Sequence, residues 1–466
     1  MKAAVHAAPI PADALERLER HHARARQLAR RTGQPTLAWV AHALERTAPP
    51  DVFARTPDQP RWLWSRPADG FELLGVGIAW RAVTRGPRRF DDAGAAWKRL
   101  VEQSVGDAPA ESVAFGGFSF APQGPYAEEW AGFPPGEVAV PRLAVVTEGG
   151  RIRIVLAAAA LPDEDGSTEL GATLSLAGRL FESVPRAGWG RGQATITAEH
   201  PAAPAWKRAV ADSAGAVREG ILRKVVLARR VELRLVSCDP ARMLAHLADA
   251  HPHCTVFAVE REGAVFCGAT PERLVRVGGG WVEAMALAGS APRGRNPDED
   301  AALAQTLVAS AKERDEHAAV VEWLREALGG VSEEISVATA PDVLQTTDVQ
   351  HLHTGLRGRL RSRAGILEVA GRLHPTPAVA GVPAEAALAW IRSCEPLDRG
   401  WYAGAVGWTN GKGEGEFAVA IRSALVRDRT AFVFAGCGIV AGSDQDREYE
   451  ESQIKMRPML RALGVR

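Results

Sequence analysis

The stretch TVFAVEREGAVFCGATPERLVRVGGGWVEAMAL, residues 255–287, decides the fold class of this chain. It holds four short apolar runs that we expect to be strands, at 255–260, 264–268, 274–277 and 281–287. The turns Arg261-Glu262-Gly263 and Gly278-Gly279-Gly280 separate the runs in pairs. Turns this short can join only antiparallel neighbours, because a parallel crossover needs about a dozen residues or more. The stretch therefore predicts two consecutive β-hairpins.

Similar patterns continue on both sides of this stretch. Residues 225–235 form an apolar, β-branched run, and near the end of the chain 417–426 and 431–434 flank the charged turn Arg427-Asp428-Arg429. Helical periods fill the intervals, at 205–219, 297–328, 383–392 and 446–463. Strands in meanders with helices grouped between them indicate the α+β class.

The first 195 residues differ in composition and are rich in Arg, Pro and Trp. They contain strand-like runs, at 71–80, 113–120 and 151–156. Residues 121–141, rich in Pro and Gly, are expected to be loop. We divide the chain into an N-terminal part, 1–195, and a second region, 196–466, which carries the motifs described below, without implying two independent folding units.

The composition excludes several classes of partner. Lys plus Arg equals Asp plus Glu at 56 each, so no net charge favours nucleic acid or an anionic membrane. No apolar run approaches the ~20 residues that cross a bilayer. The five cysteines form no CxxC pair, which indicates free thiols in a reducing cytoplasm rather than disulfides or a zinc site.

The last predicted helix carries Glu448, Glu451 and Lys455 on one face, after Ser443 or Asp444 as N-cap. Two carboxylates one turn apart repel each other unless a cation lies between them. Helix statistics alone favour a solvated Glu-Lys ladder. The preceding segment FAGCGIVAG (434–442) favours a ligand site instead, because its glycines allow close backbone approach.

A second acidic helix contains KERDEH at 312–317. Glu316 precedes the apolar residues Ala319 and Val320 by three to four positions, so its side chain could point toward the same interior. Glu316 and Glu451 together would form an oxygen-only site suited to Mg²⁺, which takes one or two carboxylates and keeps several waters.

The motifs taken together resemble the chorismate-utilising enzymes, which include isochorismate, salicylate, anthranilate and aminodeoxychorismate synthases. Ten blocks carry the resemblance in order: KVVLARR (224–230), GATPERL (268–274), ALAGSAPRG (286–294), KERDEH (312–317), DVQHLHTGL (348–356), LHPTPAVAGVP (373–383), WYAGAVGW (401–408), EFAVAIRSA (416–424), GCGIVAGSD (436–444) and EYEESQIK (448–455). The N-terminal part has a weaker echo in FGGFSF (115–120). The resemblance implies one α+β fold in which two antiparallel sheets face each other with helices packed outside.

The resemblance also assigns the reacting groups. Chorismate is a dianion, and forming isochorismate adds water at C2 while the C4 hydroxyl leaves and the double bonds shift. The resemblance implies that Lys224 is the base beside the water and Glu272 the acid beside the leaving hydroxyl. A lysine base and a glutamic acid near neutral pH both need burial or neighbours that shift their pKa values.

Mg²⁺ is the cofactor that the resemblance implies, with Glu316 and Glu451 as ligands and Glu448 as a further direct or indirect ligand. Positions that match the family's substrate pocket are Gly289, Ser290, His351, Ala378, Tyr402, Arg422, Gly436, Gly438 and Lys455. Arg422, Tyr402 and the amides near Gly436 correspond to the clamp for the enolpyruvyl carboxylate. A purely structural hydrogen bond is an equal alternative for His351.

Within the family, isochorismate synthase is the expected activity. Lys224 favours water as nucleophile, because amine-using members usually lack this lysine, and Ala378 stands where those members carry threonine. Salicylate synthase is the first alternative, followed by an anthranilate or aminodeoxychorismate synthase large subunit; a non-catalytic ligand-binding relative is a further class. No obligatory protein partner is expected. The long N-terminal part favours a menaquinone pathway over a siderophore pathway.

Overall fold

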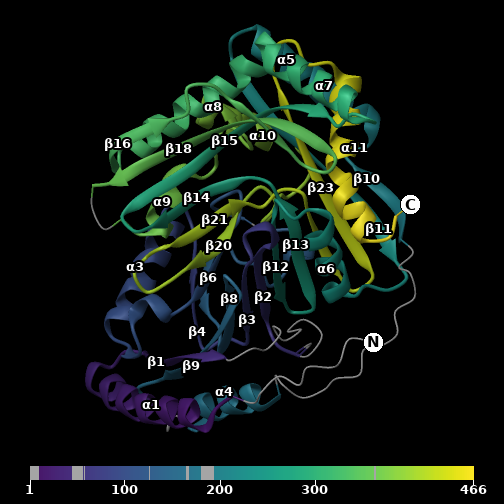
Figure 1. Ribbon diagram of the computed structural model, residues 1–466. Helices are drawn as coiled ribbons and strands as arrows, with labels where there is room; N and C mark the ends of the chain where they lie inside the picture. The colour runs from purple at the N-terminus through teal and green to yellow at the C-terminus, as the bar shows by residue number, and fades with distance from the viewer. Residues whose placement is uncertain are drawn as a thin grey trace.

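The computed structural model describes residues 10–44, 56, 58–124, 126–163, 167–179, 194–361 and 364–465. Within these residues, two β-sheets pack face to face, with helices on their outer surfaces (Figure 1). All strand pairs are antiparallel except the short parallel pair β1–β5. The predicted α+β fold with two facing antiparallel sheets is therefore confirmed.

The larger sheet contains thirteen strands among the described residues. Their order is β10 (Ala194–His200), β11 (Lys224–Leu235), β23 (Thr430–Ile439), β22 (Ser423–Arg427), β13 (Ala264–Thr270), β12 (Thr255–Arg261), β2 (Arg61–Arg66), β3 (Phe71–Val76), β8 (Leu143–Glu148), β9 (Arg151–Ala160), β1 (Thr36–Leu44) and β5 (Val105–Gly106), with β19 (Gly381–Val382) beside β11.

The smaller sheet contains ten strands in the same described ranges. Their order is β16 (Ser332–Val337), β18 (Val349–Leu360), β15 (Trp281–Pro292), β14 (Arg273–Gly278), β21 (Gly415–Val419), β20 (Ala405–Thr409), β6 (Ala114–Phe118), β7 (Gly136–Val140) and β4 (Trp80–Thr84), with β17 (Asp342–Gln345) beside β18. Both sheets thus combine strands from before and after the predicted boundary at 195/196, which falls inside β10.

Helices cover the outer face of each sheet. The helices of the described chain are α1 (Ala12–Thr32), α3 (Arg89–Glu102), α4 (Ser167–Arg179), α5 (Ala203–Arg218), α6 (Pro240–Ala250), α7 (Pro297–Ala309), α8 (Ala311–Gly329), α9 (Ile366–Leu373), α10 (Ala384–Cys394) and α11 (Gln445–Ala462), with short 3-10 turns η1 (Pro67–Asp69), η2 (Pro109–Glu111) and η3 (Glu128–Trp130). Helices α1, α4, α6 and α11 pack on the larger sheet, and α3, α8 and α9 on the smaller one (Figure 1). No helix of the described chain is long and apolar enough to cross a membrane.

The larger sheet is buried on both faces, which explains its nearly continuous apolar strands. In β2, Trp62 and Trp64 point into the core between the sheets, while Leu63 points to the core beneath the outer helices. Trp62 stacks on Phe115 of the smaller sheet with ring centroids 5.4 Å apart. The alternation of side chains along a strand therefore builds two hydrophobic cores from one sequence run.

The hairpins predicted from residues 255–287 are present as β12–β13 and β14–β15. The predicted run 417–426 is wrong as a single strand, because β21 belongs to the smaller sheet and β22 to the larger one. The chain changes sheets at Arg422, whose φ of 52° is left-handed. Apolar residues on both sides of this break hide it from a periodicity argument.

Three other expected boundaries differ from the structure. The helix expected at 297–328 is divided at Ser310, whose hydroxyl accepts a hydrogen bond from the Glu313 backbone N–H and caps α8. The loop expected at 121–141 ends in strand β7. The run 71–80 is broken after β3 at Gly77, which has a φ of 66°. In each case a local cap, turn or tertiary pairing overrides the sequence pattern.

Candidate functional site

The candidate site is a cavity lined by residues of both sheets. Strands β11 and β23 of the larger sheet, β15 and β18 of the smaller sheet, and helices α8 and α11 all contribute side chains to it. All fourteen residues predicted from the sequence line this cavity: Lys224, Glu272, Gly289, Ser290, Glu316, His351, Ala378, Tyr402, Arg422, Gly436, Gly438, Glu448, Glu451 and Lys455. Segments more than two hundred residues apart in sequence thus meet at one place.

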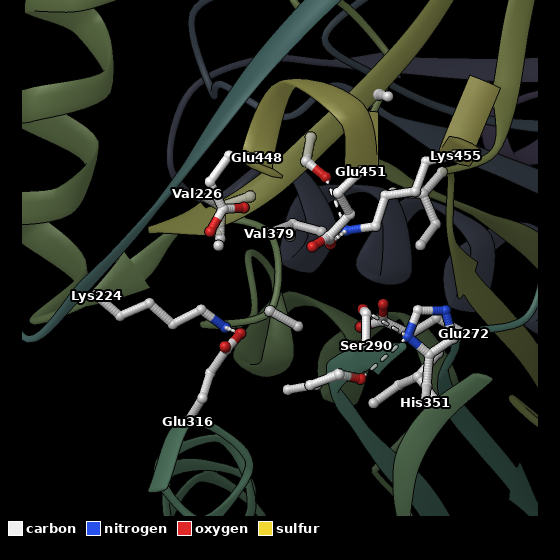
Figure 2. Close-up of a pocket in the computed structure, with 18 of the residues that line it drawn as sticks. Lys224, Val226, Glu272, Ser290, Glu316, His351, Val379, Glu448, Glu451 and Lys455 are labelled. Carbon is white, nitrogen blue, oxygen red and sulfur yellow. Dashed lines mark hydrogen bonds and ion pairs between the residues drawn. The ribbon is translucent and has the colours of Figure 1, made fainter. Parts of the chain in front are cut away.

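Lys224 and Glu316 form a buried ion pair on one side of the cavity (Figure 2). Lys224 is the first residue of β11, and its Nζ lies 2.8 Å from Oε1 of Glu316 on α8. Burial by itself raises the pKa of Glu316, but the charge and hydrogen bond of Lys224 outweigh it, and the net shift is downward. This side of the cavity therefore holds a carboxylate and an ammonium in direct contact.

Glu272 occupies a different environment in the same cavity. It lies in the short connection between β13 and β14, where its backbone N–H donates to Thr270 Oγ1 (3.2 Å) and its carbonyl accepts from the Val419 N–H (3.0 Å). Its carboxyl group makes no ion pair with any described residue. Burial raises the pKa of Glu272 to about 7, against the opposing charge of Lys224. The group can therefore hold a proton near neutral pH.

His351, Ser290 and Arg422 form a hydrogen-bonded cluster. Figure 2 shows His351 and Ser290 on the same side of the cavity as Glu272. Arg422 Nη2 lies 2.9 Å from His351 Nε2, and because a guanidinium can only donate, Nε2 must accept. The proton of the neutral ring then sits on Nδ1, which lies 3.0 Å from Ser290 Oγ and 3.2 Å from the carbonyl of Gly289. Burial, followed by the charge of Arg422, lowers the pKa of His351 well below its ordinary value. A neutral histidine thus orients a buried guanidinium.

Glycines allow the strands to approach the charged groups closely. A Cβ atom at Gly438 would lie 2.8 Å from Glu316 Oε1 and 2.9 Å from Lys224 Cε. A Cβ atom at Gly436 would lie 3.0 Å from the hydroxyl oxygen of Tyr402. Any larger residue at Gly438 would therefore displace the Lys224–Glu316 pair.

Glu448, Glu451 and Lys455 share one face of the last helix, as their spacing predicted, and this face lines the cavity rather than forming the solvated ladder that helix statistics alone favour. Asp444 caps α11 by accepting from the backbone N–H groups of Asp446 and Arg447. Lys455 Nζ lies 2.6 Å from Glu451 Oε1 and donates to the carbonyl oxygen of Gly436 at 3.0 Å. This pair ties α11 to β23 at the cavity wall.

The cavity has the donor chemistry of a hard divalent cation. Among the described residues, ligand atoms of Cys437, Glu448 and Glu451 lie within 4.8 Å of one another. Burial raises the pKa of the Cys437 thiol, which donates to the Glu448 carbonyl at 3.2 Å, so it is a poor ligand. Burial and the charge of Glu451 also raise the pKa of Glu448. Such crowding of carboxylates fits Mg²⁺, although Glu316 lies outside this group and contacts Lys224 instead.

Sequence reasoning missed two charged lining residues, Lys312 and Glu313. Glu313 Oε2 accepts from the Ser290 backbone N–H at 3.2 Å, and burial raises its pKa. Its position three residues before Glu316 was a usable signal, because residues at this spacing share a helix face. The remaining lining residues are apolar: Val226, Leu287, Ala288, Val379, Ile421 and Ala435.

Fold and site together define a pocket between two antiparallel sheets that is rich in both acidic and basic side chains. A family profile described as "Chorismate binding enzyme" matches residues 22–464. The chain therefore belongs to the chorismate-binding enzyme family.

Relatives with established names cover nearly the whole chain. It is 37% identical over 440 residues to the salicylate biosynthesis isochorismate synthase of Pseudomonas aeruginosa, which covers 93% of this chain and 91% of that protein. It is 35% identical over 417 residues to isochorismate synthase MenF of Bacillus subtilis, covering 87% and 88% of the two chains. The structure of MenF, the menaquinone-specific isochorismate synthase of Escherichia coli, matches with a TM-score of 0.79 at 25% identity, covering 97% and 99%.

Proposed function

We propose that this protein is an isochorismate synthase, an isomerase that converts chorismate to isochorismate. The similarity to isochorismate synthases over about nine-tenths of both chains supports this function. The observation that carries the chemical proposal is that Lys224 and Glu272 line the same cavity. One is held next to a carboxylate, and the other has a pKa raised to about 7.

In the proposed mechanism, Lys224 is the base and Glu272 is the acid. Lys224 must first give up the proton that it shares with Glu316; as the neutral amine it then takes a proton from water as the water oxygen bonds to C2 of the ring. The ring double bonds shift, and Glu272 gives its proton to the departing C4 hydroxyl, which leaves as water. One proton is taken up and one is released, so the reaction is balanced. Positioned acid and base groups of this kind contribute roughly 10²- to 10⁴-fold each.

The clamp for the dianionic substrate combines several residues of the opposite wall. We infer that Arg422, oriented by neutral His351, binds a carboxylate together with Tyr402 and the backbone near Gly436. Gly289, Ser290, Ala378, Gly438 and Lys455 complete the surface around the ring. Fixed polar groups in a water-poor cavity orient the substrate before the reaction.

Glu448 and Glu451, whose ligand atoms lie within 4.8 Å of each other, would hold Mg²⁺, and Glu316 from the same cavity would join them. When bound, this ion would neutralise the ring carboxylate and anchor it electrostatically. For Glu316 to bind the ion, its contact with Lys224 must loosen, which would leave the Lys224 amine available to water. Treatment with EDTA should abolish turnover, and added Mg²⁺ should restore it. Unchanged turnover after chelation would remove the ion from the proposal.

Incubation with chorismate and Mg²⁺, followed by chromatographic product analysis, tests the function. We expect isochorismate as the single product. Salicylate plus pyruvate would identify a salicylate synthase, and a product formed only with ammonia would identify an anthranilate or aminodeoxychorismate synthase subunit. An absence of any product, with chorismate still bound, would indicate a non-catalytic relative.

We also expect the enzyme to act in the cytoplasm and without an obligatory protein partner. Its five cysteines are all free thiols, and three of them, Cys254, Cys267 and Cys437, are buried. Free thiols are typical of reducing compartments.

A further inference from the structure

The edge of β11 that faces away from β23 has a gap in its strand partners. On this edge, β19 pairs with Lys224 and Val225, and β10 pairs with the residues from Arg230 onward. Residues 226–229 lie between these two partners, directly beyond Lys224. Unpaired backbone groups at such a buried edge would be costly, so something other than a strand must satisfy them.

The Val226 N–H donates to the Ala380 carbonyl at 2.9 Å, and the side chains of Arg399 and Glu395 satisfy two further backbone groups in this gap. Arg399 Nη2 donates to the carbonyl of Val226 at 2.7 Å, and Glu395 Oε1 accepts from the backbone N–H of Ala228 at 2.7 Å. The two side chains also pair with each other, with Arg399 Nε 2.8 Å from Glu395 Oε2. One ion pair thus supplies both the donor and the acceptor that a neighbouring strand would have supplied.

Arg399 of the same ion pair also contacts two other residues that line the cavity, Val379 and Tyr402. Arg399 Nη1 donates to the carbonyl of Val379 at 2.9 Å, and the guanidinium lies over the Phe120 ring at 4.2 Å. The backbone carbonyl of Arg399 accepts from the Tyr402 N–H at 2.9 Å. Val226, Val379 and Tyr402 all line the cavity, so one buried arginine connects three of its lining residues.

We propose that Arg399 and Glu395 are positioning residues that set the place of Lys224 relative to the rest of the cavity. The proposal rests on the function proposed above. Val226 is two residues from Lys224 on the same strand, so a shift of this edge moves the base. Arg422, between β21 and β22, and His351, on β18, lie outside this edge and should stay in place. A displacement of the base by about 1 Å can reduce a rate by roughly 10²-fold.

The variant Arg399→Lys tests the proposal, because an ammonium keeps the charge but cannot reach Val226, Val379 and Glu395 in one plane. We expect kcat to fall roughly tenfold or more while KM for chorismate changes less than about threefold. Amide hydrogen exchange should rise together in residues 226–228 and 374–382. Arg392→Lys, at an exposed position of α10, is the matched control and should leave all three measurements unchanged.

All assays are run well below the unfolding temperature of each variant, so that a loss of folded protein cannot imitate a loss of kcat. If Arg399→Lys does not fold, Glu395→Gln decides by the same measurements, since its amide oxygen can still accept from Ala228. A wild-type-like kcat in a folded variant, or a rise in KM equal to the fall in kcat, overturns the positioning role. If the wild-type protein forms no isochorismate, the proposed function fails instead, and the exchange data alone then decide whether the pair holds the two segments together.

Discussion

Glu316 and Glu272 are two buried glutamates in one cavity whose environments drive their pKa values in opposite directions. Glu316 contacts the Lys224 ammonium at 2.8 Å, which lowers its pKa. Glu272 has no ion-pair partner among the described residues, and burial raises its pKa to about 7. Burial acts on both carboxyl groups in the same direction, so a single contact decides the difference. The fold thereby keeps one glutamate, Glu316, ionised and allows another, Glu272, to be protonated near neutral pH.

Removing the Lys224 amino group should have the largest effect on the difference between Glu316 and Glu272. We expect Lys224→Ala to lower kcat by roughly 10³-fold or more, because the proposed base is lost and Glu316 is left buried without its partner. The pKa of Glu316 should then rise toward that of Glu272. Steady-state kinetics with chorismate measure the effect on rate. Lys98→Ala, on the exposed face of α3, is the control. Turnover within about threefold of wild type would reject Lys224 as base.

Glu272→Gln removes the proposed acid and should cause the next largest fall in kcat. The amide is nearly isosteric but has no acidic proton for the leaving hydroxyl, so we expect kcat to fall roughly 10²- to 10³-fold. Chorismate binding, measured by calorimetry, should remain, since the carboxylate clamp is intact. Glu102→Gln at the exposed end of α3 serves as the control. Loss of binding together with rate would instead assign Glu272 to the clamp.

The raised pKa of Glu272 predicts a pH dependence with a definite sign. An acid with a pKa of about 7 is protonated below that pH and becomes ionised above it. We therefore expect kcat/KM to fall as pH rises through about 7, tenfold per unit at the limit. The pH profile of wild-type enzyme measures this limb, and the residual rate of Glu272→Gln should lack it. A flat wild-type profile across this range would show that the proton comes from another group.

The sequence predicted Lys224, Glu272 and Glu316 as site residues, but it did not predict that the pKa values of the two glutamates shift in opposite directions. Helix spacing placed Glu448, Glu451 and Lys455 on one face, and Asp444 as N-cap, since these are local properties. The Lys224–Glu316 contact joins a strand to a helix about ninety residues later, so no local pattern encodes it. Side-chain pairing across sheets depends on register, which apolar alternation fixes only approximately.

The change of sheet at Arg422 shows that local sequence patterns also fail to predict some features of the backbone. The residues from 415 to 427 are almost all apolar or small, so the sequence reads as one strand, yet β21 and β22 lie in different sheets. Arg422 has a left-handed φ at this crossing, and its guanidinium donates to His351. The order of the family motifs along the sequence predicted that Arg422 belongs to the site. Its backbone conformation depends on how β21 and β22 pair in two different sheets, which the sequence pattern did not predict.

The smallest effect is expected at the hydrogen bond between Ser290 and His351. In Ser290→Ala, the Nδ1 proton of His351 can still be accepted by the Gly289 carbonyl at 3.2 Å, so the ring keeps its tautomer and Arg422 its orientation. Loss of one such bond costs about 0.5–1.5 kcal/mol, which corresponds to a roughly two- to tenfold rise in KM. We expect kcat to stay close to wild type, as measured by steady-state kinetics. The clamp then tolerates the loss of one contact, whereas Lys224 and Glu272 have no substitute, because a proton transfer needs one particular group at one place. A large fall in kcat would mean that the Ser290 hydroxyl takes part in the reaction itself.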